Sequence, residues 1–144
     1  MANQQEEGGK VYGVTEKFGY NTISYNKEKV KPEDLEDLNA LWSGKFKGRI
    51  AVYDYYLPML GLMQVAAGKK TAEMTEADLG PISETLAKLK AETKLVGDVV
   101  SSQTALATGE VDILFGGGDW VSAVLAKDNP KFDRSEERRV GKEC

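Results

Sequence analysis

The sequence predicts an α/β fold in which a mostly parallel sheet carries helices on both faces. Two observations lead to this prediction: short apolar runs alternate with segments of helical periodicity, and glycine, proline and acidic residues stand at the boundaries between them. The chain has 144 residues, of which 41% are hydrophobic and 29% charged, as in ordinary globular domains. A chain of this length can bury enough surface to fold by packing alone.

The first third of the chain is predicted to hold two extended segments and one helix. Residues 1–9 are polar and are expected to be loose. β-Branched and aromatic residues near turn-forming glycine and asparagine predict short strands or hinge crossings at Val11–Val14 and Thr22–Tyr25. Pro32, followed by two acidic residues, favours the start of a helix that ends at Gly44.

The middle of the chain is predicted to hold a buried strand and two helices. Ile50–Tyr53 is a brief apolar run typical of a parallel strand, and Asp54 is predicted to cap the helix Tyr55–Ala67. Thr75–Asp78 resembles a capping box for the second helix. Because proline fits poorly inside a helix, a start at Pro81 is the alternative.

The remaining elements continue the alternation of strand and helix. In chain order they are a strand, a short helix, a second strand and a helix, expected at Leu95–Val96, Ser102–Thr108, Val111–Phe115 and Trp120–Lys127. In an open sheet of this kind, ligands bind beyond the carboxyl ends of the parallel strands. The strand-to-helix junctions are therefore the candidate site.

Three such junctions are predicted to face one crevice. Their polar side chains have two interpretations, since Asp54, Ser101 and Asp119 could equally be ordinary helix caps. Aromatic faces hold cations, and the carboxylates disfavour an anion, so a neutral or cationic ligand fits best. The candidate ligand-binding residues at the junctions are Asp54, Tyr55, Tyr56, Ser101, Ser102, Gln103, Gly118, Asp119 and Trp120.

Several function classes are disfavoured by composition. Histidine is absent and Cys144 is the only cysteine, which argues against the usual catalytic triads, histidine bases and zinc sites. No cofactor is expected. The four aspartates Asp54, Asp98, Asp112 and Asp119 leave an acid–base pair open, although their spacing does not favour one. The formal charge of −4 without a basic stripe argues against nucleic acid, and no apolar run reaches membrane-spanning length.

The last eleven residues, Arg134–Cys144, break from the preceding pattern. The string RSEERRVGKEC is the in-frame translation of a common sequencing-library adapter, and the alternative is a solvated charged tail. The adapter interpretation predicts that the natural sequence departs from this one after Asp133. Under this interpretation, the polar start of the sequence does not indicate where the protein works. Taken by itself, that start has no signal peptide and would indicate the cytoplasm.

Four stretches together resemble a known family, the family-1 extracellular solute-binding proteins of the spermidine/putrescine-binding type. They are VYGV at Val11–Val14, GYNTISYNKEKV at Gly19–Val30, LWSGKFKGRIAVYD at Leu41–Asp54 and ALATGEVDILFGGGDW at Ala105–Trp120. The resemblance implies a type II periplasmic-binding-protein fold, in which two α/β lobes are joined by crossing strands. This incomplete chain would supply a hinge crossing at residues 10–30 and most of the second lobe at residues 31–133.

The family consists of capture subunits of ABC importers, which work outside the cytoplasmic membrane with a permease and an ATPase. The resemblance therefore implies binding of a small solute between the lobes without chemistry, with a polyamine-like or other nitrogenous cation favoured. It adds Tyr20 and Asn21 to the ligand-binding candidates. The chain departs from the polyamine binders where Tyr55 and Pro58 stand at their acidic positions and Gly117 at their tryptophan.

An amino-acid-like or sugar-like solute also remains open, and two alternatives of other kinds remain at this stage. Adjacent tyrosines are similar to those of ferric-ion-binding relatives, but the pair in those relatives follows the later strand, where this chain has Gly117 and Gly118. The second alternative is a cytoplasmic enzyme or ligand-sensing domain that shares the fold, because fold alone does not fix function.

Overall fold

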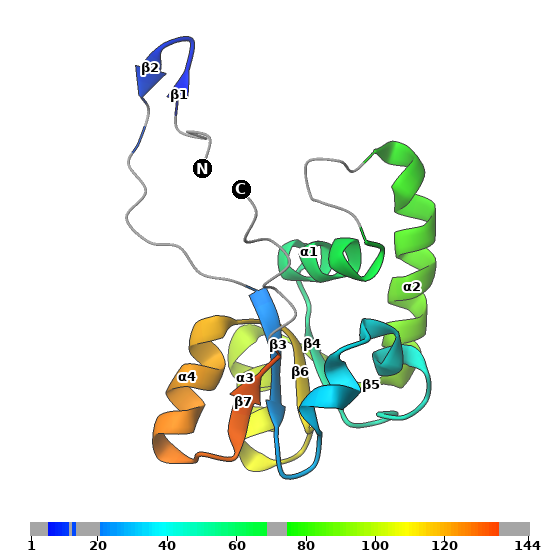
Figure 1. The fold of residues 1–144 in the computed structure, drawn as a ribbon, viewed down its shortest axis with the longest axis vertical. Coiled ribbons are helices and arrows are strands. Elements are labelled where there is room, and N and C mark those ends of the chain that lie inside the picture. Colours follow the sequence, from blue (N-terminus) through cyan, green and yellow to red (C-terminus); the bar gives the residue numbers. More distant parts are fainter. Residues whose placement is uncertain (1–5, 12, 14–20, 69–74, 136–144) are drawn as a thin grey trace.

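The computed structural model describes residues 6–11, 13, 21–68 and 75–135, whose centre is a five-stranded sheet of order β5-β4-β6-β3-β7 (Figure 1). β4 pairs in parallel with β5 and β6, and β3 is antiparallel to both β6 and β7, so β3 alone runs against the other four. The predicted mostly parallel sheet is confirmed. The strands are β3 (Asn21–Asn26), β4 (Ile50–Tyr53), β5 (Thr93–Gly97), β6 (Ile113–Gly118) and β7 (Phe132–Arg134).

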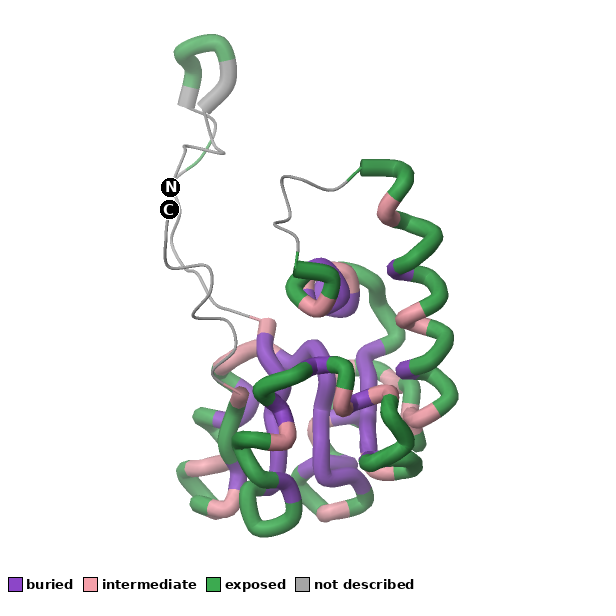
Figure 2. Tube along the Cα trace, turned by 45° about the vertical axis from the view of Figure 1, so that its right-hand side comes forward, coloured by how far each residue is buried: buried purple, intermediate pink, exposed green. Residues whose placement is uncertain are grey.

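Helices cover both faces of the sheet, as predicted. One face carries α1 (Tyr56–Ala66), α2 (Leu79–Glu92) and two short 3₁₀ helices, and the other carries α3 (Val99–Thr108) and α4 (Asp119–Asp128). Alternate residues of the central strands enter separate cores, and these strands form the buried centre in Figure 2. None of the described helices is long and apolar enough to cross a membrane.

The single helix predicted from Pro32 is wrong, because two 3₁₀ helices, η1 (Pro32–Leu35) and η2 (Leu38–Trp42), take its place. Asp37 separates them in an extended conformation, and its carboxylate accepts a hydrogen bond from the Asn39 amide at 2.9 Å. The spacing of the leucines gives the physical reason. Each leucine follows the previous one by three positions, which is the period of a 3₁₀ helix. The three leucines therefore share one buried face: Leu35, Leu38 and Leu41.

The predicted start of α2 is resolved in favour of the capping box. The backbone N–H and hydroxyl of Thr75 both donate to the Asp78 carboxylate at 2.9 Å, η4 (Glu76–Asp78) follows, and α2 begins at Leu79. Pro81 is thus the third helical residue rather than the first. It is tolerated there because the first N–H groups of a helix have no internal partner.

The strand predicted to end at Phe115 continues to Gly118 and pairs with β3 along its whole length. A bulge makes this possible: Thr22 lies opposite Gly117 and Ile23 opposite Phe115, which leaves Gly116 unpaired with a φ of +90°. The glycine run 116–118 is therefore the bulged end of β6.

The strands β1 (Glu6–Glu7) and β7 were not predicted, and β2 (Lys10–Val11) overlaps the predicted strand Val11–Val14 only at Val11. β1 and β2 form a separate antiparallel pair, in place of the loose segment expected there. β7 contains Arg134, which belongs to the segment interpreted as adapter-derived, and the Ser135 amide donates to the carbonyl of Ile23 at 2.8 Å. Of the strand predicted at Val11–Val14, Tyr12 and Val14 lie outside the described residues.

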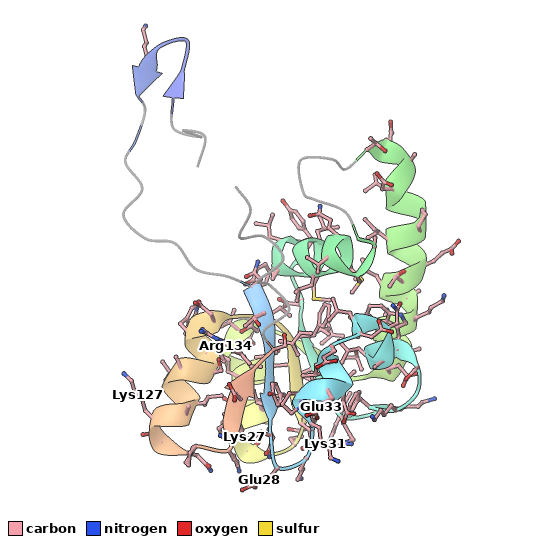
Figure 3. All side chains as sticks on the ribbon, viewed as in Figure 1. Lys27, Glu28, Lys31, Glu33, Lys127 and Arg134 are labelled. Carbon is pink, nitrogen blue, oxygen red and sulfur yellow. The ribbon has the colours of Figure 1, made fainter. Side chains whose placement is uncertain are left out.

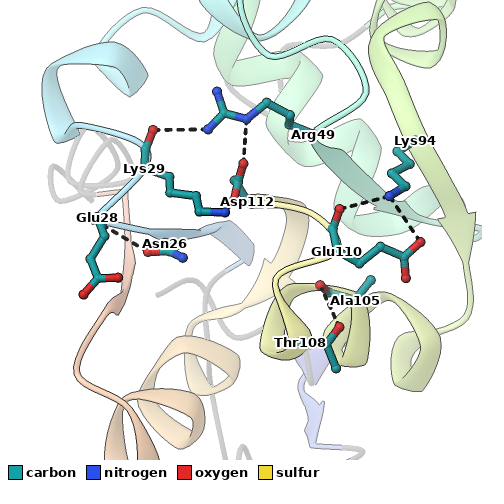
Figure 4. A network of polar contacts seen from close by, with 9 residues as sticks. All are labelled: Asn26, Glu28, Lys29, Arg49, Lys94, Ala105, Thr108, Glu110 and Asp112. Carbon is teal, nitrogen blue, oxygen red and sulfur yellow. Dashed lines mark hydrogen bonds and ion pairs between the residues drawn. The ribbon is translucent and has the colours of Figure 1, made fainter.

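An ionic network closes the amino end of the parallel strands (Figure 4). Asp112, just before β6, accepts a hydrogen bond from Arg49 Nε at 2.5 Å and lies 3.5 Å from Lys29 Nζ. Arg49 also donates to the carbonyl of Lys29 at 3.2 Å, while the Asp112 amide donates to the carbonyl of Arg49 at 2.9 Å. The network ties the start of β4 and β6 to the segment that follows β3.

Candidate functional site

The carboxyl end of the parallel strands brings the predicted junctions together. β4, β5 and β6 all end there, and antiparallel β3 begins there, with Asn21 opposite Gly118. Figure 1 shows α1 lying across this end of the sheet. The topology therefore gathers all three predicted junctions and Asn21 at one rim, whereas Tyr20 lies outside the described residues.

The junction after β4 exposes aromatic surface. The rings of Tyr53 and Tyr55 stack with centroids 5.5 Å apart and planes 13° apart. Tyr55 is 43% exposed and Tyr56 is 66% exposed, so both can meet a ligand. The predicted cap at Asp54 is wrong: the cap position is Tyr55, and no side chain accepts a hydrogen bond from the start of α1.

Asp54 stands one residue too early to cap because its own amide is held by the sheet. This N–H donates to the carbonyl of Gly97 at 3.0 Å, which extends the pairing of β4 with β5 by one residue. The exposed Asp54 side chain therefore stands at the rim, just before α1. A carboxylate in this position can receive a cationic group.

Tyr53, the last residue of β4, holds this junction in place through its stacking with Tyr55. The ring is buried in the core on the α3 face, and burial raises the pKa of the phenol, because the charged form would lose its hydration. Gln103 Nε2 lies 3.2 Å from the Tyr53 hydroxyl and donates to it. Gln103 was predicted to contact the ligand, and in the structure its amide holds the tyrosine on which Tyr55 stacks.

The junction after β5 is closed by its own side chains. Asp98 caps α3, accepting hydrogen bonds from the backbone N–H of Ser101 at 2.9 Å and from its hydroxyl at 2.8 Å. These bonds, the backbone one first, lower the pKa of the Asp98 carboxyl. Ser101 is therefore not the cap, and α3 begins at Val99 instead of Ser102.

Ser102 is fully buried, and its hydroxyl faces the carbonyl of Gly97 at 3.2 Å and that of Val52 at 3.4 Å. Ser101 and Ser102 were predicted to bind the ligand, and in the structure their hydroxyl groups form hydrogen bonds to neighbouring residues of the chain. The role of Asp98 as a cap was not predicted, although Asp-x-x-Ser before an apolar segment is a recognisable start of a helix.

The junction after β6 combines a carboxylate with an exposed indole. Gly118 is at the cap position of α4 and Asp119 is its first residue, so Asp119 is not the predicted cap. Trp120 is 53% exposed, and its indole folds back over Gly118, where any side chain would collide with the ring. Arg134 on β7 lies beside this junction (Figure 3), with Nη1 3.5 Å from Asp119 Oδ2.

The rim therefore offers aromatic faces and two carboxylates, a combination that suits a cationic or neutral polar group. Within the described residues, no group of three or more His, Cys, Asp or Glu side chains is arranged to hold a metal ion. Of the predicted residues, the exposed ones are Asp54, Tyr55, Tyr56, Ser101 and Trp120, and the partly exposed ones are Asn21, Gln103, Gly118 and Asp119.

Comparison with known proteins places this geometry in a structural class. No protein-family model matches the chain, and neither does any curated protein sequence. Among solved structures, the spermidine/putrescine ABC transporter substrate-binding protein of Streptococcus pneumoniae shares 20% identity at a TM-score of 0.71. A putative spermidine/putrescine ABC transporter protein of Listeria monocytogenes shares 19% at 0.70, and in both cases the alignment covers 81% of this chain and 35% of the other.

An iron-bound protein of Pseudomonas aeruginosa, HitA, also matches, with 18% identity, a TM-score of 0.60 and coverage of 83% of this chain and 37% of the other. These likenesses confirm the predicted fold, which is that of one lobe of a type II periplasmic binding protein. The chain spans little more than a third of the length of the solved structures that it matches.

Proposed function

We propose that the chain is part of the solute-capture subunit of an ABC importer, and that the rim at the carboxyl end of its sheet is one wall of the solute-binding cleft. The observation that carries the proposal is the gathering of exposed aromatic rings and carboxylates there, on a fold shared with transporter substrate-binding proteins. Such a subunit binds and releases a solute without changing it. It would work outside the cytoplasmic membrane with a permease and an ATPase.

The favoured solute is a small nitrogenous cation of the polyamine type. Asp54 and Asp119 would receive ammonium groups, and the faces of Tyr55 and Trp120 would cover the chain between them. Aromatic faces contribute about 0.5–2 kcal/mol to holding a cation, depending on how far it is desolvated. Asn21, Tyr56 and Gly118 stand at the same rim and complete this wall.

Isothermal titration of the full-length protein against polyamines, sugars and ferric ion tests the proposal. We expect saturable binding of putrescine or spermidine, weakened about tenfold by Trp120→Ala, in line with about 1.4 kcal/mol for a partly desolvated contact. Lys127→Ala, on the same helix but away from the rim, is the matched control. Binding of ferric ion alone would replace this proposal with the metal-binding alternative, and binding of no member of the panel would overturn it.

A further inference from the structure

A groove adjoins the rim on the face of the sheet that α1 and α2 cover. It has a volume of about 330 Å³ and is lined by the end of β4, the start of α1, one side of α2 and Val96 of β5. Its floor consists of apolar side chains that belong to the fold's core, namely Val52, Met59 and Leu89. This volume is in the range of sites for small molecules.

The walls of the groove leave large apolar groups in water. Tyr55, Tyr56 and Val96 are 43%, 66% and 51% exposed, although each borders a hollow floored by buried side chains. A ligand that filled the hollow would cover these surfaces and gain the free energy of removing them from water. An unbranched aliphatic polyamine can lie along the face of one ring, but it has no ring or branched group that would fill the hollow between all three side chains.

Two charges of opposite sign stand among the otherwise uncharged lining. Asp54 follows β4, and Lys90 lies in the last turn of α2, so the two reach the groove from different elements. Both residues are exposed. An apolar hollow with one anionic and one cationic side chain matches a ligand that carries both charges next to an apolar group.

We propose that this groove binds a small amphipathic zwitterion of the aromatic amino acid class. The ammonium group of the ligand would pair with Asp54, its carboxylate with Lys90, and its ring would pack between Tyr55 and Val96. The groove shares Asp54, Tyr55 and Tyr56 with the proposed cleft, but every residue that lines it belongs to this chain. Binding there needs no second lobe, so it can fail or succeed independently of the proposed importer function.

Titration of the ¹⁵N-labelled 144-residue chain, followed by two-dimensional NMR, tests the proposal. L-Phenylalanine is expected to cause saturable shifts at the amides of Lys90 and Val96. Phenethylamine lacks the carboxylate and hydrocinnamate lacks the ammonium group, so each should bind about two- to fivefold more weakly, the range for one exposed ion pair. Putrescine should cause no saturable shift at Lys90 and Val96, which line the groove but not the proposed polyamine wall.

Two variants make the result specific. Lys90→Gln should reduce affinity for phenylalanine to that of phenethylamine, whereas Lys88→Gln, exposed on the same helix but outside the groove, should leave it unchanged. Val96→Lys should abolish binding, and its spectral dispersion shows whether the fold is kept. The proposal is overturned by the absence of saturable shifts, by equal affinity for phenylalanine and phenethylamine, or by shifts confined to Val100 and Trp120.

Discussion

The two ends of the sheet use charge and apolar surface in opposite ways. At the amino end, Asp112 is almost buried, and its carboxylate is paired with Arg49 and Lys29. At the carboxyl end, large aromatic side chains are exposed, and α1 and α4 begin without a side-chain cap. The difference separates residues that hold the fold from residues that are available to a ligand, and it can be tested at both ends.

The largest effect is expected at the amino end. Arg49→Met would leave the buried Asp112 carboxylate without its closest cationic partner. Removing one member of a buried pair costs about 3–5 kcal/mol, and because Arg49 is partly exposed we expect about 2–3 kcal/mol of lost unfolding free energy. Urea unfolding measures this loss.

Lys45→Met is the matched control, since it removes an ion pair to Asp34 in which Lys45 is half exposed. Its effect on the unfolding free energy should be much smaller than that of Arg49→Met. Equal losses for the two variants would mean that burial of Asp112 does not distinguish the amino end.

A smaller loss is expected at the bulge of the carboxyl end. Gly116 has a φ of +90°, and a Cβ there would lie 3.3 Å from Met59 Sδ and 3.4 Å from Pro58 Cβ. Gly116→Ala should therefore cost about 1–2 kcal/mol, the penalty of a left-handed conformation for a residue with a side chain. Gly61→Ala, inside α1 with open space around it, should instead stabilise by about 0.5–1 kcal/mol. Thermal unfolding of both variants measures these changes. An unchanged or raised Tm for Gly116→Ala, or a lowered Tm for Gly61→Ala, would contradict the prediction.

The sequence predicted the elements whose signal is local and missed those that depend on distant contacts. Elements with a local signal were found: Ile50–Tyr53 is a strand as predicted, and α3 ends at Gly109 in the left-handed conformation. β7 was missed because Phe132 is its only buried residue and leaves no periodic pattern. The bulge at Gly116 was missed because it is a feature of the register between β6 and β3, and β3 lies far away in the sequence.

The candidate site was predictable in place but not in detail. The parallel topology alone puts the junctions at one rim, whereas the roles of Gln103 and Ser102 depend on contacts with β4, about fifty residues earlier. The groove could not be predicted, because Asp54, Lys90 and Val96 meet only after α2 has packed beside β4 and β5.

The contribution of the junction after β5 to stability should depend on pH, because Asp98 caps α3 there, whereas α1 and α4 begin without a side-chain cap. The pKa of Asp98 is lowered in the folded state, so its contribution to stability is present above the ordinary aspartate pKa and is lost as the pH falls through the lower folded value. Asp98→Ala should lower Tm at neutral pH by less than Gly116→Ala does, and the difference from wild type should shrink below about pH 4.

Asp98→Asn separates the cap from its charge. Asparagine is a comparable cap, so this variant should keep most of the neutral-pH stability and lose the pH-dependent part. Thermal unfolding of the three proteins between about pH 3 and pH 7 covers the transition. A pH-independent gap between wild type and Asp98→Ala would mean that the charge of Asp98 contributes nothing.

The smallest effect on stability, and the most informative for binding, is expected at Arg134. Its guanidinium lies 3.5 Å from the Asp119 carboxylate, with side chains 46% and 29% exposed, and such pairs contribute about 0–1 kcal/mol. Arg134→Gln should therefore leave Tm nearly unchanged. If Asp119 receives a cationic solute, however, Arg134 competes for the same carboxylate, and its removal should strengthen the binding of a diamine to the 144-residue chain. Titration of wild type, Arg134→Gln, Asp119→Asn and the double variant checks this, because the gain must disappear when Asp119 is also replaced. A gain that persists would place the cation elsewhere on the rim.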